Sequence, residues 1–319
     1  MPMLLSSSSW PLLLVFAVGL VCGSWLSPCW TTTAVPPSSE AYDVSYRKHS
    51  THVQRIPPAL QTRAGLAAFL QADGVDQQRH AYMLSAARVV LLAYPSSSWL
   101  TVGDLRFGSD ALFLERHGAV ATASDIDGTR LAHAQRLGFL QRYAVENAER
   151  LSFADNTFDL VLCKEAFHHF PRPFVAFYEM LRVSRLGVLL IEPHDVVDCT
   201  QRLHNTTKDS LLLTGFRDFY EGVGNYKYQV SVRELLKAAW ALRLPLVATR
   251  GLNDHFVPRM TWEAFQERVH RLDEKGRTGQ RPYNLVAVLV MKQPLSQTAR
   301  LALQREEFVL IERPPEPPV

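Results

Sequence analysis

Two short segments, 21 residues apart, carry the clearest potential for ligand binding. One contains the run Val102-Gly103-Asp104-Leu105-Arg106-Phe107-Gly108, and the other ends an apolar run at Asp125. Glycines such as Gly103 and Gly108 permit a tight turn and let a ligand approach the backbone closely. An acid at the end of the next strand can accept hydrogen bonds from both hydroxyls of a ribose. The two segments therefore predict a site for a cofactor that contains a nucleoside.

The glycine pattern separates the candidate cofactors. A dinucleotide fingerprint has the form G-x-G-x-x-G, whereas Leu105 occupies the position of the middle glycine in this chain. The carboxylate of Asp104 would repel a pyrophosphate but suits a ligand with an amino group and a sulfonium. We therefore expect S-adenosylmethionine. Two alternatives stay open: an NAD-type oxidoreductase, and a non-catalytic scaffold of the same fold, which the glycine lost at Leu105 motivates.

Four segments in one third of the chain carry a family resemblance. They are VGDLRFGSD from Val102, ASDID from Ala123, ENAERLSFADNTFDLVLCKEAFHHF from Glu146 and GVLLIEP from Gly187. Together they resemble the class I S-adenosylmethionine-dependent methyltransferases of the type 11 domain group. The resemblance implies an α/β fold with a doubly wound, seven-stranded, mostly parallel sheet and an antiparallel last strand. It also implies methyl transfer to an acceptor that the sequence does not identify, with release of S-adenosylhomocysteine.

The resemblance assigns roles to individual residues. Those expected to contact S-adenosylmethionine are Gly103, Asp104, Gly108, Asp125, Ile126, Asn147, Ala148 and Lys164. The glycine-loop residues would line the methionine half, while Asp125 would bind the ribose and Ile126 would pack on the adenine. Asn147 and Ala148 would hold the edge of the adenine. Lys164 would face the reactive end of the cofactor, with its ammonium directed away from the sulfonium.

Titratable side chains beyond two apolar runs are the candidates for catalysis. They are Glu165, His168 and His169 after the first run, and His194 and Asp195 after the second. An oxygen or nitrogen nucleophile can need a general base, and imidazole titrates near neutral pH. We expect this base among His168, His169 and Glu165; the alternative for the two histidines is a structural role at the strand end. Without a helical H-E-x-x-H pair, no metal site is expected.

Later loops that combine polar and aromatic residues with glycine are candidates for contact with the acceptor. The residues singled out there are Tyr226, Asn253, Asp254 and His255. Loops often carry substrate contacts. Turn formation by glycine, asparagine and aspartate is the alternative explanation for the same residues.

The segments that must position these residues alternate in periodicity. Apolar runs typical of strands lie at 99–102, 119–124, 143–147, 158–163, 187–192, 244–249 and 285–292. Amphipathic stretches typical of helices lie at 109–117, 129–136, 172–182, 231–242 and 261–272, and 59–92 is mostly helical in pattern. This alternation predicts βαβ units and a parallel sheet covered on both faces. Ligands of such sheets bind beyond the carboxyl ends of the strands.

Composition excludes several classes of protein. The 319 residues are 47% hydrophobic and 20% charged, which is typical of a globular chain and excludes collagen, a coiled coil and wholesale disorder. The net charge of +3 is too small for a chain that coats nucleic acid, so no nucleic-acid partner is expected. Four cysteines make no disulfide scaffold in a chain of this length.

The first residues form a separate apolar segment. No Asp, Glu, Lys or Arg precedes Glu40, and residues 10–26 are almost wholly apolar. As a helix this segment would span about 26 Å, at the short edge of what crosses a bilayer. A cleaved signal peptide, an uncleaved membrane anchor and an organelle-targeting leader all stay open. We expect membrane association or entry into the secretory pathway through this segment.

These patterns divide the chain into four regions. Residues 1–30 form the apolar leader, and residues 31–58, which are rich in Pro, Ser and Thr, form a linker. Residues 59–292 form the methyltransferase domain with a helical N-terminal cover. Residues 293–319 form a C-terminal extension that ends in a Pro-rich tail.

Overall fold

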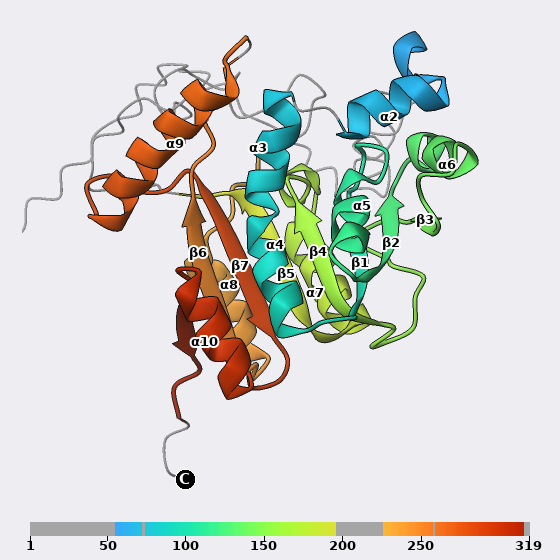
Figure 1. Ribbon diagram of the computed structural model, residues 1–319. Helices are drawn as coiled ribbons and strands as arrows, with labels where there is room; N and C mark the ends of the chain where they lie inside the picture. Colours follow the sequence, from blue (N-terminus) through green and yellow to red (C-terminus); the bar gives the residue numbers. More distant parts are fainter. Residues whose placement is uncertain (1–54, 72–73, 196–225, 258, 316–319) are drawn as a thin grey trace, which may run out of the picture. The chain divides into compact units, whose positions relative to one another are not determined.

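The computed structural model describes residues 55–71, 74–195, 226–257 and 259–315. Within these ranges one sheet of eight strands, in the order β3-β2-β1-β4-β5-β7-β6-β8, is flanked by helices (Figure 1). The strands are β1 (Ser98–Val102), β2 (Val120–Asp125), β3 (Tyr143–Val145), β4 (Phe158–Lys164), β5 (Ser184–Pro193), β6 (Leu246–Leu252), β7 (Leu285–Met291) and β8 (Val309–Glu312). The expected strands are therefore all present, together with β8.

Nine α-helices and two short 3-10 turns accompany the sheet in the described ranges. The helices are α2 (Arg63–Gln71), α3 (Val75–Met83), α4 (Ser85–Ala93), α5 (Ser109–Arg116), α6 (Thr129–Arg136), α7 (Pro173–Val183), α8 (Val232–Ala241), α9 (Trp262–Arg277) and α10 (Gln297–Arg305). The turns are η1 (Pro58–Leu60) and η2 (Phe167–His169). The stretch at 59–92, expected to be mostly helical, contains the helices α2, α3 and α4.

The pairing of the strands confirms the predicted fold class. Strands β3, β2, β1, β4 and β5 pair in parallel, whereas β7 pairs antiparallel with both β5 and β6. Strand β8 pairs antiparallel with β6, so the sheet has one strand more than the seven expected. The segment expected as a C-terminal extension thus contributes α10 and β8 to the sheet and its covering layer.

Alternate residues of the central strands point into two separate cores. Trp99, Leu160 and Leu189 join the core beneath α4, α5 and α10, while Leu100 and Val161 join the core beneath α7 and α8. Successive side chains of a strand point to opposite faces of its sheet. Because both faces are covered, the strands read as continuous apolar runs, which is typical of buried parallel sheets (Figure 1).

The register of the parallel strands brings the predicted site segments to one edge. Val102 pairs with Ser124 on one side and with Cys163 on the other. Gly103, directly after β1, therefore lies between the carboxyl ends of β2 and β4. Lys164 in turn pairs with Ile191 of β5, which brings the end of β5 into the same row.

Several predictions fall outside the described residues. They concern the apolar leader at 1–30, most of the linker at 31–58, and the last residues of the Pro-rich tail. Across the described ranges, no helix combines the length and the apolar character that a bilayer crossing requires.

Candidate functional site

The turn after β1 depends on glycine at its first position. Gly103 has a φ of +78°, and a Cβ built there would lie 2.3 Å from the Cβ of Ala166. The amides of Gly103 and Asp104 both donate to the carbonyl oxygen of Ser124 on β2, at 2.9 and 3.0 Å. Since L side chains rarely adopt this conformation, glycine is required here both for the backbone angle and for the close approach of the loop after β4.

The side chain of Asp104 joins this loop to α5. Its carboxylate accepts hydrogen bonds from Thr101 Oγ1 at 2.9 Å and from the amides of Asp110 and Ala111 at 3.2 and 2.9 Å. The residue is only 3% exposed, and burial raises the pKa of its carboxyl group. A carboxylate bonded to amides at a helix start caps that helix. The structure therefore gives Asp104 a structural task, and its contact with a cofactor stays a prediction.

The second glycine of the loop precedes α5 directly. Gly108 has a φ of +74°, and a Cβ there would lie 2.5 Å from Leu140 Cδ1. Phe107 before it also has a positive φ, of 60°, and is buried. The loop is thus compact and held on both sides, and its middle position accommodates Leu105 without a third glycine.

The acid predicted to bind a ribose lies at the end of β2. Asp125 is 7% exposed, and one carboxylate oxygen accepts the amide of Asp127 at 2.9 Å. Burial, reinforced by the nearby charge of Asp127, raises the pKa of Asp125 to about 6. Ile126 follows and is half-buried, and its contact with adenine stays a prediction. The Asp125 carboxylate is therefore held beside the glycine turn, and it can accept further hydrogen bonds.

The adenine-edge candidates lie beyond β3. Asn147 accepts the amide of Glu149 through Oδ1 at 2.9 Å, and its backbone bridges to Arg150. Ala148 is buried in the core beneath α7. The Asn147 side chain thus stabilises its own turn, and its contact with adenine stays a prediction.

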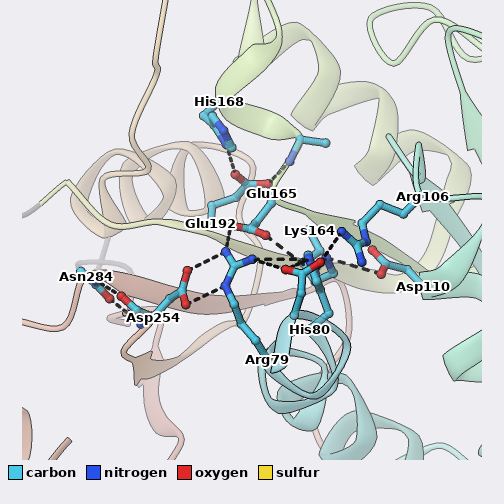
Figure 2. Close-up of polar contacts among 12 residues, drawn as sticks. Arg79, His80, Arg106, Asp110, Lys164, Glu165, His168, Glu192, Asp254 and Asn284 are labelled. Atoms are coloured by element: carbon cyan, nitrogen blue, oxygen red, sulfur yellow. Dashed lines mark hydrogen bonds and ion pairs between the residues drawn. The ribbon is translucent and has the colours of Figure 1, made fainter. Parts of the chain in front are cut away.

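Lys164, the last residue of β4, belongs to a buried polar cluster (Figure 2). Its ammonium lies 3.4 Å from Asp110 Oδ1 and 2.9 Å from His80 Nδ1. An ammonium can only donate, so His80 accepts at Nδ1 and carries its proton on Nε2. Burial and the charges of Lys164, Arg106 and Arg79 push the pKa of His80 far below its usual range, which keeps the ring neutral.

Glu165 follows in a strained conformation. Its φ is +50°, which is uncommon for a residue other than glycine. Its carboxylate lies 3.3 Å from Arg79 Nη2 and 3.8 Å from His80 Nδ1. The same guanidinium donates to both carboxylate oxygens of Asp254, at 2.7 and 2.6 Å. Helix α3 thus ties the loop after β4 to the loop after β6.

A second carboxylate at the sheet edge organises the loop that carries the candidate bases. Glu192 is fully buried and accepts the amides of Ala166 and Phe167 at 2.8 and 2.9 Å. Its other oxygen lies 2.7 Å from His168 Nδ1 (Figure 2). The ring of His169, half-buried, lies 4.1 Å from that of His168 between centroids. A carboxylate bonded at Nδ1 fixes the ring and leaves Nε2 as the atom that could move a proton.

Two of the remaining candidates, His194 and Asn253, contact the same residue: the amide of His194 donates to the Asn284 carbonyl at 3.0 Å, and the amide of Asn284 donates to Asn253 Oδ1 at 3.4 Å. His194 contacts the carbonyl of Tyr283 at 3.1 Å, and burial lowers the pKa of its ring. Asn253 is buried and donates to Asp273, a structural contact, while Tyr226 is half exposed. Burial lowers the pKa of His255. In the described part of the chain no group of His, Cys, Asp and Glu has an arrangement that could hold a metal ion.

Several residues at this edge were missed by the sequence patterns. Glu192 closes an apolar run and Asp110 lies in the first turn of α5, so both had a positional signal. Arg79 and His80 had none, because only the docking of α3 brings them to the sheet edge. A cavity of about 190 Å³ lies between α3 and α5, with His80 and Ser109 among its lining residues.

Comparisons with known proteins agree with this geometry. A family model described as a methyltransferase domain matches residues 103–191. Over 111 residues the chain is 32% identical to 2-methyl-6-phytyl-1,4-hydroquinone methyltransferase of Synechocystis sp. (strain ATCC 27184 / PCC 6803 / Kazusa), a match that covers 34% of each chain. The chain thus spans about a third of the length of this curated relative.

Solved structures with similarity to the chain include two bacterial proteins. The YcgJ protein of Bacillus subtilis is 19% identical, with a TM-score of 0.46, 67% of this chain covered and 100% of the other. Magnesium protoporphyrin IX methyltransferase of Synechocystis PCC 6803, solved with bound S-adenosylhomocysteine, is 14% identical, with a TM-score of 0.45 and coverages of 80% and 95%.

The region matched by the family model contains the glycine turn, Asp125, the end of β4 and all but the end of β5. These are the elements whose register forms the candidate site. The match to a methyltransferase domain therefore covers residues 103–191, the part of the chain that holds most of the candidate site.

Proposed function

We propose that the protein transfers a methyl group from S-adenosylmethionine to a nucleophilic acceptor and releases S-adenosylhomocysteine. The observation that carries this proposal is the position of Asp125, buried at the end of β2 beside the positive-φ turn at Gly103. A carboxylate there can accept hydrogen bonds from vicinal ribose hydroxyls. The family match of the same segment supports methyl transfer over other uses of a nucleoside.

The residues at this edge suit the cofactor by their chemistry. Gly103 forms the tight turn after β1, Asp125 offers carboxylate oxygens, and Ile126 offers an apolar side chain. Two arginines near the loop, Arg106 and Arg130, hold buried N–H groups with no hydrogen-bond partner among the described residues. The donor and acceptor set thus fits a ligand that carries hydroxyls, an aromatic base and an anionic end.

Methyl transfer from this cofactor needs little chemical catalysis by the side chains of the protein. The cofactor supplies an activated methyl group: the acceptor's lone pair forms the new bond to the methyl carbon while the carbon–sulfur electrons return to sulfur. Positioning of the two reactants supplies much of the rate. Where the acceptor loses a proton, His168 is the best-placed base, because Glu192 holds its Nδ1 at 2.7 Å. Glu165 and His169 are the other candidates.

Calorimetry of S-adenosylhomocysteine binding to the full-length protein tests this proposal. We expect measurable affinity for wild type and about a 10- to 100-fold weaker affinity for Asp125→Asn, because a charged hydrogen bond typically contributes about 1.5–3 kcal/mol. Asp159→Asn is the matched control, since Asp159 lies at the opposite end of β4 and bonds to Ser98 and Arg185.

The outcomes separate the two alternatives. Tight NAD binding without affinity for S-adenosylhomocysteine would indicate an oxidoreductase. No binding of either ligand at millimolar concentration would indicate a non-catalytic scaffold, consistent with Leu105 in place of a glycine. Equal affinities of wild type and Asp125→Asn for S-adenosylhomocysteine would show that Asp125 does not bind the ribose.

We also propose that residues 10–26 attach the protein to a membrane or direct it into the secretory pathway. The charge-free, apolar character of this stretch supports the proposal. Fractionation of cells expressing the full chain or a chain lacking residues 1–30 tests it. Mass analysis of the mature N-terminus then separates a cleaved signal from a retained anchor. If both chains fractionate as soluble proteins and the full chain keeps an intact N-terminus, neither membrane attachment nor secretion is supported.

A further inference from the structure

Arg106 in the glycine loop has donors that the protein does not use. Its Nη1 pairs with Asp76 Oδ2 at 2.9 Å, and its guanidinium lies over the ring of Phe69, 5.2 Å from the centroid. Its Nε and Nη2 are buried, yet they have no hydrogen-bond partner among the described residues. A buried donor without a partner is destabilising, so such a group points to an acceptor that arrives from outside.

The position of Arg106 restricts what that acceptor can be. It lies three residues after Gly103 and two before Gly108, in the turn that approaches Asp110 and the end of β4 (Figure 2). The guanidinium acts electrostatically on both Asp110 and His80, which places it beside the Lys164 cluster. Asp125, which is expected to hold the ribose, is the last residue of β2, the strand that pairs with β1 on the side away from β4.

The charges around Arg106 favour an anion. Lys164 already pairs with Asp110, and Arg79 already pairs with Asp254 and Glu165. Among the described residues Arg106 forms an ion pair with Asp76 alone, whose side chain is 39% exposed and therefore well hydrated. Planar N–H groups of a guanidinium match the two oxygens of a carboxylate.

We propose that Arg106 binds the carboxylate of the methionine half of the cofactor through Nε and Nη2. This inference rests on the proposed function, because S-adenosylmethionine has one anionic group and that group lies at the end away from the adenine. Arg106 thus selects a nucleoside that carries an amino-acid tail over one that lacks it. Phe69 of α2 and Asp76 of α3 hold the guanidinium in place from the N-terminal helices.

Calorimetry with two ligands tests this assignment on the full-length protein. S-adenosylhomocysteine carries the carboxylate, whereas 5′-methylthioadenosine keeps the nucleoside and the sulfur but has no amino-acid tail. For Arg106→Gln we expect S-adenosylhomocysteine to bind about 10- to 100-fold more weakly, with 5′-methylthioadenosine unchanged. Arg106→Lys, which keeps a charge but loses the planar fork, should give an intermediate loss.

A matched control removes one positive charge elsewhere. Arg88→Gln alters an exposed arginine on α4 and should leave both affinities unchanged. The assignment is overturned if Arg106→Gln binds S-adenosylhomocysteine as wild type does, or if it loses affinity equally for both ligands. No binding of S-adenosylhomocysteine by wild type would instead overturn the proposed function, so the two failures are distinguishable.

Discussion

The ammonium of Lys164 lies 3.4 Å from a carboxylate oxygen of Asp110, and both side chains are almost fully buried. Burial raises the pKa of Asp110 to about 7, while the charge of Lys164 opposes the rise. Two ions buried together stabilise one another, whereas removal of one partner leaves an uncompensated charge. The pair therefore joins the end of β4 to the first turn of α5, and each charge depends on the other for its stability in the core.

Removal of the cation alone should destabilise the protein. We expect Lys164→Met to lower the free energy of unfolding by about 3–5 kcal/mol at pH 8, with a smaller loss at pH 5, where Asp110 is largely protonated in the wild type. Urea denaturation at the two pH values measures this. The double variant Lys164→Met/Asp110→Asn should recover part of the loss, and strictly additive effects would contradict the coupling.

Charge at Asp125 should make the unliganded protein less stable as pH rises. A folded pKa of about 6 lies above the unfolded value of about 3.9, so the native state binds more protons between these values and its stability falls with rising pH. Asp125→Asn should remove this slope and gain about 1–3 kcal/mol at pH 8. Urea titrations between pH 4 and 8 provide the measurement.

The control for this pH dependence has the opposite sign. The pKa of Asp159 is lowered, with backbone and side-chain hydrogen bonds from Ser98 and Arg185 outweighing its desolvation. Asp159→Asn should therefore lose stability at pH values above the unfolded value of about 3.9 and change little at lower pH. A wild-type slope that persists unchanged in Asp125→Asn would show that another group is responsible. Binding of S-adenosylhomocysteine should tighten as pH rises through 6 in wild type and in Asp159→Asn, but not in Asp125→Asn.

Gly103→Ala should disturb the glycine turn by two separable effects. The φ of +78° costs an L residue about 1–2 kcal/mol, and the new Cβ would meet the Cβ of Ala166. Gly118→Ala is the matched control, because Gly118 has a φ of +90° and open space around it. Thermal or urea unfolding should show a larger loss for Gly103→Ala, and equal losses would rule out the contact with Ala166.

Glu192→Gln should weaken the loop that carries the candidate bases. The fully buried Glu192 carboxylate accepts hydrogen bonds from two backbone amides and lies beside His168 Nδ1. In Glu192→Gln the side-chain NH₂ would replace one of these acceptor oxygens and would face an N–H donor. We expect a loss of about 3 kcal/mol in the free energy of unfolding and a change in the NMR chemical shifts of the His168 ring. Glu263→Gln, at an exposed position on α9, should change neither quantity.

Local patterns predicted the elements of this fold closely. The helix expected at 129–136 coincides with α6, and the strands expected at 158–163 and 285–292 differ from β4 and β7 by one residue. Apolar runs between capping and turn residues carry their own signal, because each buries its side chains within a few residues of sequence. The strand β8 was missed, since its apolar run at 308–311 is only four residues long and lies within the segment expected as a C-terminal extension.

The site was only partly accessible to such reasoning. Gly103 and Asp125 could be found because the edge at which parallel strands end is a property of the topology, which the alternation of elements already implies. Asp104 was expected to face the cofactor, yet its carboxylate is bonded to the amides that begin α5. Which way a polar side chain turns depends on the donors around it, and those come from the folded chain.

The sequence alone determined the sheet and the edge at which Gly103 and Asp125 lie, because these follow from short-range periodicity and glycine chemistry. Only the tertiary structure decided that Arg79 and His80 meet Glu165 and Lys164. It also decided that Nε and Nη2 of Arg106 are buried without a hydrogen-bond partner among the described residues. These contacts join residues up to 86 positions apart, and burial rather than spacing sets their charges and partners.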